Sequence, residues 1–319
     1  MEGAGPTARR LVISRRRFLG AVLIAPAALL AAPEASAFEP WWVANFEPTD
    51  LWSGPDANAV SFRRVPQFRR FLVVQPQEGD RLYVWDPRTQ NYAWIDAADV
   101  GPTGPSVWAD LQPPVEVGPV GLPARTVAPA VVYEHPLAHE ELRLDELPHN
   151  RPVNGAVAVE GQNGERWYRV PEGYVPASAL RFPRSPTTTF PGRWIDADLR
   201  EPCLVTAYEG ARAVYAALAV KGSRVHSTPT GVFHIVRRVA NETMDSETIG
   251  IPRNSRGGYY LRDVLFTQYF TWNGHSLHYN WWRANFGYAG SHGCLGLTYA
   301  DARFFWDWAG LGTPLVIRS

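Results

Sequence analysis

The sequence predicts a mainly β protein in which two small barrels precede a larger β-rich domain with one short helix. Short aromatic and β-branched runs recur along the chain, each bounded by turn residues. The 28 Pro and 27 Gly residues are scattered, as many short strands joined by turns require. Hydrophobic residues make up 45% of the 319 and charged residues 19%, a composition typical of a folded chain. The length exceeds what one average domain needs.

The charge balance and the cysteine count narrow the possible functions. Lys and Arg total 31, and Asp and Glu also total 31, so the net charge is zero with neutral histidines. This balance argues against a nucleic-acid partner or a membrane surface bound through bulk charge. The chain has only two cysteines, Cys203 and Cys294, so no disulfide scaffold is indicated. A single bridge between them remains an alternative.

The first 37 residues have the pattern of an export signal. Three arginines, Arg15 to Arg17, precede Phe18-Leu19, an apolar run covers residues 21–32, and Ala35-Ser36-Ala37 forms a small-residue cleavage site. The paired arginines resemble a Tat-type signal in particular. The apolar run is shorter than the roughly 20 residues of a membrane span. We therefore expect cleavage near Ala37, no stable membrane span after processing, and an extracytoplasmic protein. An uncleaved anchor is the alternative.

Two stretches, residues 38–110 and 111–183, repeat one scheme of strands. Each has an aromatic strand, a short turn and a β segment that ends in a 3₁₀-like exit. The strands are expected at residues 82–85 and 92–95 in the first stretch and at 156–159 and 164–170 in the second. These stretches resemble tandem bacterial SH3-like barrels, which fill their interior with alternate side chains. The resemblance implies binding of wall peptides or positioning of a neighbouring domain; a plain spacer is the alternative.

A third unit is expected at residues 192–319, after a stiff linker at 184–191. Strands are predicted at residues 204–208, 213–220, 232–235 and 314–317. Thr298 and Asp301 have the spacing of a helix N-terminal capping box. Phe304, Phe305 and Trp308 then fall on one face of the predicted helix.

The residues that indicate chemistry are Ser291-His292-Gly293-Cys294. A thiolate is a strong nucleophile, and a nearby imidazolium or helix N-terminus lowers the pKa of its thiol. A histidine within reach can take the thiol proton and later protonate a leaving amine. His275 and His278 lie upstream, and the amides around Gly293 and Cys294 can stabilise a tetrahedral oxyanion. The pattern therefore predicts a cysteine-dependent acyl-transfer site with a readily ionised sulfur.

This string resembles the active-site signature of the L,D-transpeptidases, whose catalytic domain is called YkuD-like. That signature has a histidine, a spacer of about a dozen residues or slightly more, and then Ser/Thr-His-Gly-Cys. The resemblance covers the third unit and implies that Cys294 is the nucleophile and His278 the general base. It also implies that His292 supports the pocket or the oxyanion, that Gly293 belongs to the oxyanion site, and that Ser291 holds the loop.

His275 competes with His278 for the role of base, because its spacing also falls within the range of the family. We prefer His278, since residues 271–277 before it match the strand that delivers the family histidine. Residues three apart on a strand face opposite ways, so we expect only one of the two to face the thiol.

The chain departs from the family pattern at two positions. Tyr279 stands where Gly or Ser is common, and Gly296 where Asn or Arg is common. The carbonyl of Tyr279 can still orient the imidazole, whereas Gly296 removes a side chain that usually braces the loop or substrate. A substrate groove is expected along Tyr279, Trp281, Trp282, Phe286 and Gly287; simple packing of this loop is the alternative.

The resemblance implies a reaction on peptidoglycan stem peptides without a cofactor or metal. Cys294 would form a thioester with a tetrapeptide stem and release D-Ala, and a neighbouring amine would complete a cross-link. Acylation by carbapenems is also implied. Three alternatives stay open: an L,D-carboxypeptidase that passes the same thioester to water, a non-catalytic wall-binding protein, and a zinc site of His278, His292 and Cys294.

Overall fold

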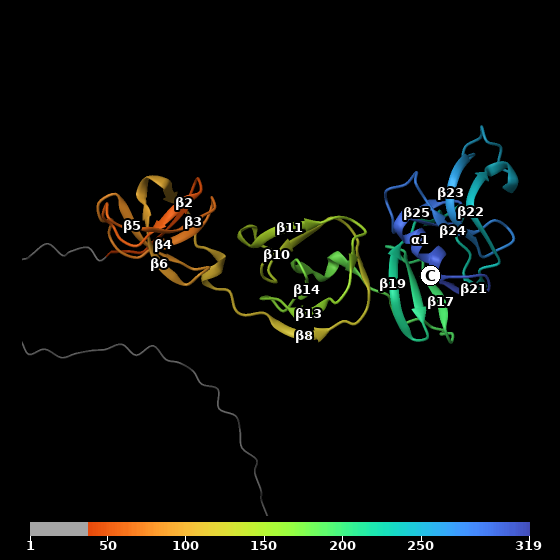
Figure 1. Cartoon of the computed structure of the whole chain (residues 1–319), viewed down its shortest axis with the longest axis horizontal. Coiled ribbons are helices and arrows are strands. Elements are labelled where there is room, and N and C mark those ends of the chain that lie inside the picture. The colour runs from red at the N-terminus through yellow and green to blue at the C-terminus, as the bar shows by residue number, and fades with distance from the viewer. Residues whose placement is uncertain (1–37) are drawn as a thin grey trace, which may run out of the picture.

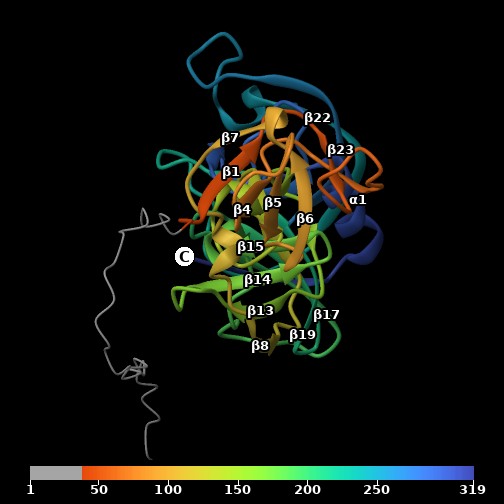
Figure 2. The same cartoon turned by 90° about the vertical axis from the view of Figure 1, so that its left-hand side faces the viewer.

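Three β-rich units follow one another along the chain in the computed structural model, which describes residues 38–319. Figure 1 shows them side by side in chain order, and Figure 2 looks along the row with the sheet of the first unit in front. The export signal expected in residues 1–37 lies outside the described part of the chain. No helix in the described part is long and apolar enough to cross a membrane.

The first unit is one sheet with the strand order β3-β2-β6-β5-β4-β1-β7. On β5 every second residue is buried, and Phe71, Val84 and Ile95 are completely enclosed. The predicted aromatic strands and the 3₁₀ exit η1 (Ala97–Asp99) are confirmed. Strands β3 and β7 end the sheet without pairing to each other among the described residues, so the closed barrel predicted here is not observed. The strands are β1 (Trp41–Asn45), β2 (Thr49–Trp52), β3 (Ser61–Val65), β4 (Arg70–Val73), β5 (Arg81–Asp86), β6 (Asn91–Asp96) and β7 (Val100–Pro102).

The second unit has a six-stranded sheet, β11-β10-β15-β14-β13-β8, and a three-stranded sheet, β12-β9-β16. The predicted exit is confirmed as η4 (Ala177–Ala179), but again the described strand pairings do not close a barrel. Its strands are β8 (Val115–Pro119), β9 (Ala124–Thr126), β10 (Ala130–Tyr133), β11 (Arg143–Leu147), β12 (Pro152–Val153), β13 (Val157–Glu160), β14 (Arg166–Val170), β15 (Gly173–Pro176) and β16 (Leu180–Arg181).

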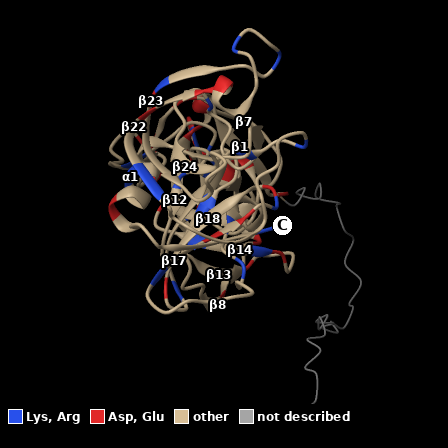
Figure 3. Ribbon diagram, turned by 90° about the vertical axis from the view of Figure 1, so that its right-hand side faces the viewer, with Lys and Arg blue, Asp and Glu red and all other residues tan. Residues whose placement is uncertain are grey.

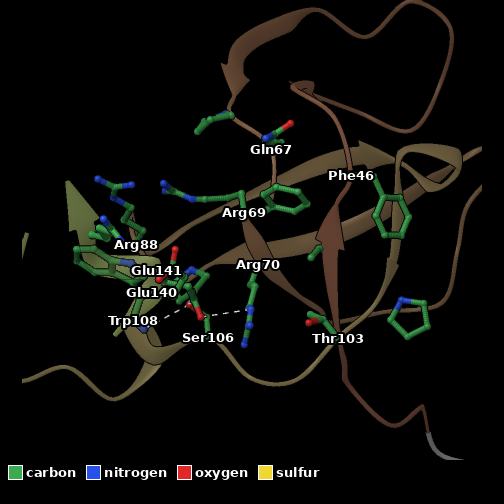
Figure 4. Close-up of a pocket in the computed structure, with 16 residues that line it drawn as sticks. Phe46, Gln67, Arg69, Arg70, Arg88, Thr103, Ser106, Trp108, Glu140 and Glu141 are labelled. Atoms are coloured by element: carbon green, nitrogen blue, oxygen red, sulfur yellow. Dashed lines mark hydrogen bonds and ion pairs between the residues drawn. The ribbon is translucent and has the colours of Figure 1, made fainter. Parts of the chain in front are cut away.

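Ion pairs and a cavity of about 610 Å³ lie where the first two units meet. Figure 4 shows that Arg70 and Ser106 approach Glu141 there. The Arg70 Nε lies 3.3 Å from a Glu141 carboxylate oxygen, and the Ser106 hydroxyl donates to Glu141 at 2.6 Å. Arg88 pairs with Glu134 across the same junction. The arginines of this cavity are therefore largely neutralised by neighbouring carboxylates.

The third unit contains three sheets, ordered β19-β18-β17-β27-β21, β22-β23-β24-β26 and β20-β25. A core that includes Val205, Leu277, Leu295 and Phe305 joins the first two sheets to α1. Apart from α1 (Tyr299–Trp308) and η5 (Ser246–Ile249), the elements are β17 (Arg193–Asp198), β18 (Leu204–Glu209), β19 (Arg212–Leu218), β20 (Lys221–Gly222), β21 (Gly231–His234), β22 (Arg237–Asp245), β23 (Tyr260–Tyr269), β24 (Ser276–Tyr279), β25 (Ala289–Ser291), β26 (Leu295–Leu297) and β27 (Pro314–Arg318).

The helix and strands predicted for the third unit are confirmed. The Thr298 hydroxyl accepts from the Asp301 amide at 3.2 Å, which is the expected N-cap of α1. Phe305 is buried in the core, and Phe304 and Trp308 pack against it. Viewed from the side of the third unit, acidic and basic residues are interspersed (Figure 3), in keeping with the balanced charge.

Arginine ion pairs to buried carboxylates join the second unit and the linker to the third unit. Arg125 on β9 donates to Asp301 at 2.5 Å and to the Ala216 carbonyl at 2.6 Å. Arg181 and Arg184 both pair with Asp198, whose side chain is 3% exposed. Since Asp301 lies in the first turn of α1, the second unit is anchored to the helix that follows β26.

Candidate active site

Two neighbouring parallel strands, β24 and β26, carry the candidate site. Leu277 pairs with Leu295 and His278 with Gly296. Both leucines are buried in the core. Because side chains alternate along a strand, Ser276, His278 and Cys294 face the opposite side of the sheet. The alternation thus brings the predicted nucleophile and the predicted base to one surface.

Cys294 lies at the wall between two cavities. The first, here called the histidine cavity, has a volume of about 280 Å³ and is lined by His278, Asn280, Trp282, His292 and Cys294 among others. The second, the hairpin cavity, has a volume of about 710 Å³ and lies beside β22, β23 and the turn that precedes β24. The Cys294 Sγ is 3.5 Å from the Ser276 hydroxyl and 3.6 Å from the Gly274 carbonyl oxygen.

The sulfur is not readily ionised in this structure, contrary to the prediction from sequence. Burial raises the pKa of Cys294, and hydrogen bonding from Ser276 offsets only part of this shift. Burial also lowers the pKa of His278 to about 4. At neutral pH the resting pair is therefore a thiol and a neutral imidazole, and the proton must move when the substrate is attacked.

The orientation of His278 suits it to accept that proton. Its Nδ1 lies 2.7 Å from the Tyr279 carbonyl oxygen. A carbonyl can only accept, so Nδ1 carries the hydrogen and Nε2 keeps its lone pair. Trp282 stacks on the ring with 5.7 Å between centroids and an interplanar angle of 18°. The Tyr279 backbone thus orients the imidazole, as expected, and Trp282 covers one of its faces.

His275 has a different environment. Its Nδ1 lies 3.0 Å from the Thr271 hydroxyl, and its backbone amide donates to the same hydroxyl at 3.1 Å. Its ring packs on Phe270. His275 is not among the residues that line either Cys294 cavity. These contacts favour His278 over His275 as the base.

Ser291 and Gly293 shape the loop that carries the cysteine. The Ser291 hydroxyl donates to the Cys294 carbonyl at 2.6 Å and accepts from the Gly293 amide at 3.1 Å. Gly293 has a φ of 113°, and a Cβ there would lie 2.6 Å from the His275 ring. The Gly293 amide already donates to the Ser291 hydroxyl. Of the two amides expected to bind the oxyanion, this leaves the Cys294 amide.

His292 lines the histidine cavity but stacks with other rings. His226 lies 4.6 Å from its centroid and Tyr259 lies 5.1 Å away. Burial lowers the pKa of His292, and His226 adds to the effect. His292 therefore lies among other rings in the wall of the histidine cavity. His226, Tyr259 and Ser276 were not identified as site residues from sequence, because no local motif marks them.

The expected groove residues fall into three groups. Trp282 lines the histidine cavity, whereas Trp281 is 51% exposed and donates from its indole to the Arg262 carbonyl. The Tyr279 side chain packs against Tyr299, away from the thiol side. Phe286 belongs to an apolar cluster with Leu204 and Leu218, and Gly287 abuts Pro202. Neither Phe286 nor Gly287 lines the two Cys294 cavities, and the packing of Phe286 in this cluster agrees with the alternative expected for the loop.

The surroundings of the cysteine loop bear on three further points raised by the sequence. Strand β26 lies between Cys294 and α1 in the sequence. Cys203 is fully buried in the core, and both cysteines are free. Within residues 38–319, His278, His292 and Cys294 do not form a group arranged for a metal ion.

The third unit is similar in sequence to a known class of catalytic domain. Residues 192–317 match the family model described as the L,D-transpeptidase catalytic domain, YkuD. L,D-transpeptidase 1 of Mycobacterium tuberculosis is 38% identical over 98 residues, which are 30% of this chain and 39% of that protein. Probable L,D-transpeptidase 3 of the same organism is 28% identical over 103 residues, 32% of this chain and 38% of that protein. The match thus spans about two fifths of these curated relatives.

Solved structures of similar proteins were also found. The structure of the L,D-transpeptidase LdtMt1 in complex with imipenem aligns with a TM-score of 0.38 and 22% identity, over 65% of this chain and 100% of that one. L,D-transpeptidase 3 from Mycobacterium tuberculosis, in complex with a faropenem-derived adduct, aligns with a TM-score of 0.38 and 16% identity, over 64% of this chain and 98% of that one.

Proposed function

We propose that this chain is a peptidoglycan L,D-transpeptidase that works through a thioester on Cys294. The observation that carries the proposal is that His278 on β24 and Cys294, which directly precedes the paired strand β26, line one cavity within a segment that matches the catalytic-domain model. The free cysteine supplies the nucleophile and the oriented imidazole supplies the base. The resemblance of the Ser-His-Gly-Cys loop supports the same assignment.

The reaction begins with attack of the thiol on a peptide carbonyl. The His278 Nε2 takes the thiol proton as the sulfur attacks the carbonyl carbon between a diamino acid and the terminal D-Ala of a tetrapeptide stem. The Cys294 amide is placed to stabilise the tetrahedral oxyanion. Collapse of that intermediate breaks the C–N bond, and His278 protonates the departing D-Ala amine. The product of this half-reaction is a thioester on Cys294.

The second half-reaction transfers the acyl group to an amine. A side-chain amine of a neighbouring stem attacks the thioester and loses a proton to His278, and the sulfur leaves as the thiol. Cys294 lines both the histidine cavity and the hairpin cavity, so two peptides can reach it from different sides. This arrangement favours transfer over hydrolysis of the thioester.

The parts outside the catalytic segment are assigned within the same proposal. Residues 38–110 and 111–183 are two SH3-like modules that hold wall peptides or position the catalytic domain at 192–319, and 184–191 is the linker. Residues 1–37 are a Tat-type signal that delivers the enzyme to the cell wall. Carbapenems acylate Cys294, because their strained carbonyl is open to the same thiol.

Product analysis with purified muropeptides tests the proposal. The protein is incubated with disaccharide-tetrapeptides, and the products are separated by mass. Cross-linked dimers together with free D-Ala are expected, and the Cys294→Ala variant should form neither. Trimmed tripeptide monomers without dimers would instead identify a carboxypeptidase. Absence of any product from either protein would leave a wall-binding role.

A further inference from the structure

One polar side chain at the site has no role in the chemistry described above. Asn280 directly follows β24, and its backbone amide donates to the Leu297 carbonyl at 2.8 Å, which extends the pairing with β26. With the alternation of β24, Asn280 lies on the same side of the sheet as Ser276 and His278. It lines the histidine cavity together with His278 and Cys294.

The Asn280 side chain occupies space that Gly296 leaves open. A Cβ placed on Gly296 would lie 2.4 Å from the Asn280 Nδ2 and 2.9 Å from its Cβ. The φ of Gly296 is outside the left-handed region, so its backbone does not itself demand glycine. Glycine is required at position 296 because the Asn280 side-chain amide approaches it closely. Gly296 is also the residue that pairs with His278 in the sheet.

The amide oxygen of Asn280 lacks a partner. Asn280 is 2% exposed, and its Oδ1 is buried without a hydrogen bond to any described residue. An unsatisfied buried acceptor typically destabilises a fold, so such groups are rare unless a ligand or water completes them. A primary amide offers one acceptor and two donors, which matches the N–H and C=O pair of an extended peptide.

We propose that Asn280 is a substrate-positioning residue whose Oδ1 accepts a hydrogen bond from a backbone N–H of the acyl-donor stem peptide. The inference rests on the proposed L,D-transpeptidase function and adds a specific contact to it. Asn280 fixes the donor backbone beside His278, so that the scissile carbonyl meets the Cys294 sulfur. Gly296 permits this by leaving the space that the amide fills.

Donor binding and donor turnover test the contact separately. In a Cys294→Ala background, where no thioester forms, Asn280→Ala is expected to weaken binding of a synthetic tetrapeptide ending in diamino acid–D-Ala about tenfold. In the active protein, Asn280→Ala should lower kcat/KM for the same tetrapeptide about tenfold or more. Alkylation of Cys294 by iodoacetamide, which needs no peptide contact, should be unchanged. Asn154→Ala, an exposed asparagine in the second unit, is the matched control.

A reciprocal substitution separates this role from simple packing. Gly296→Asn alone should reduce turnover, because its Cβ would collide with the Asn280 amide. Asn280→Gly combined with Gly296→Asn returns an amide to the same space and should restore kcat/KM to within about threefold, whereas a packing role would leave turnover low. Thermal unfolding of each variant checks that it folds.

The outcomes distinguish this inference from the proposed function. Unchanged tetrapeptide binding and turnover in Asn280→Ala would overturn the inference and leave the transpeptidase proposal intact. A parallel loss of binding, alkylation and unfolding temperature, without rescue by the double variant, would also overturn it in favour of packing. If the wild-type protein forms no product but the tetrapeptide still binds through Asn280, the contact stands and the proposed reaction is wrong.

Discussion

Arg125 of the second unit donates a hydrogen bond to Asp301 at the start of α1, across 176 residues of sequence and with a separation of 2.5 Å. Both side chains are almost fully buried. Asp301 also accepts from the hydroxyls of Thr298 and Tyr215. This network fixes the helix that packs behind β24 and β26, so the second unit contributes to the framework of the site.

Removing Arg125 should therefore destabilise the protein strongly. Arg125→Met leaves Asp301 buried without its cation, and loss of one partner of a buried pair typically costs 3–5 kcal/mol. We expect a loss of about 3 kcal/mol in the free energy of unfolding, measured by urea denaturation followed by tryptophan fluorescence. Arg151→Met is the control, because Arg151 pairs with Glu172 at the surface and should change stability by less than about 1 kcal/mol. Equal effects of the two substitutions would contradict this account.

His278→Ala should abolish most acylation while His275→Ala retains it. His278 lines the cavity with Cys294, whereas His275 is held by Thr271 in the preceding turn. Loss of a general base typically lowers a rate by about 10²–10⁴. The rate of carbapenem adduct formation, followed by intact-protein mass, is the measurement. The reverse order of the two variants would identify His275 as the base.

The pH dependence should show a neutral catalytic pair. Burial lowers the pKa of His278 to about 4, and only a neutral imidazole can accept a proton. Acylation is therefore expected to stay constant from neutral pH down to about pH 5 and to fall as His278 is protonated near its pKa. Burial raises the pKa of Cys294 above the ordinary cysteine value of about 8.5, so alkylation by iodoacetamide should still be increasing at that pH. A plateau of alkylation below pH 6 would indicate a thiolate–imidazolium pair instead.

Gly293→Ala should damage both stability and activity. A Cβ there would lie 2.6 Å from the His275 ring, on a backbone with a φ of 113°. Backbone strain of this kind costs about 1–3 kcal/mol, and the displaced loop would move the Cys294 amide. Urea denaturation and the acylation rate are the measurements. Gly310→Ala is the control, because the added Cβ meets nothing within 4 Å, and it should have no comparable effect. If Gly293→Ala changed stability and acylation as little as Gly310→Ala does, the loop would tolerate a side chain.

Local sequence patterns predicted the parts of the fold that depend on near neighbours. Thr298 and Asp301 are three residues apart, and they cap α1 as expected. The string from Ser291 to Cys294 and the spacing to His278 predicted the thiol and the imidazole as site groups, and both line the histidine cavity. The aromatic and β-branched runs at residues 82–85 and 92–95 likewise predicted β5 and β6.

What the sequence could not predict depends on residues brought together from far apart. The raised pKa of Cys294 follows from its burial, which the flanking string does not encode. The approach of Asn280 to Gly296 depends on the register between β24 and β26. Barrel closure in the first two units depends on which strands pair at the ends of each sheet, and the described pairings leave them open. The packing of Phe286 against Leu204 and Leu218 likewise depends on residues that are far apart in the sequence.

The central claim is that Cys294 carries the acyl group, and the mass of the intact protein tests it most directly. After incubation with a carbapenem at neutral pH, the wild-type protein should gain the mass of one bound inhibitor, and peptide mapping should place it on Cys294. The Cys294→Ala variant should gain none. An unmodified wild-type protein, or an adduct that survives in Cys294→Ala, would contradict the assignment of Cys294 as the nucleophile.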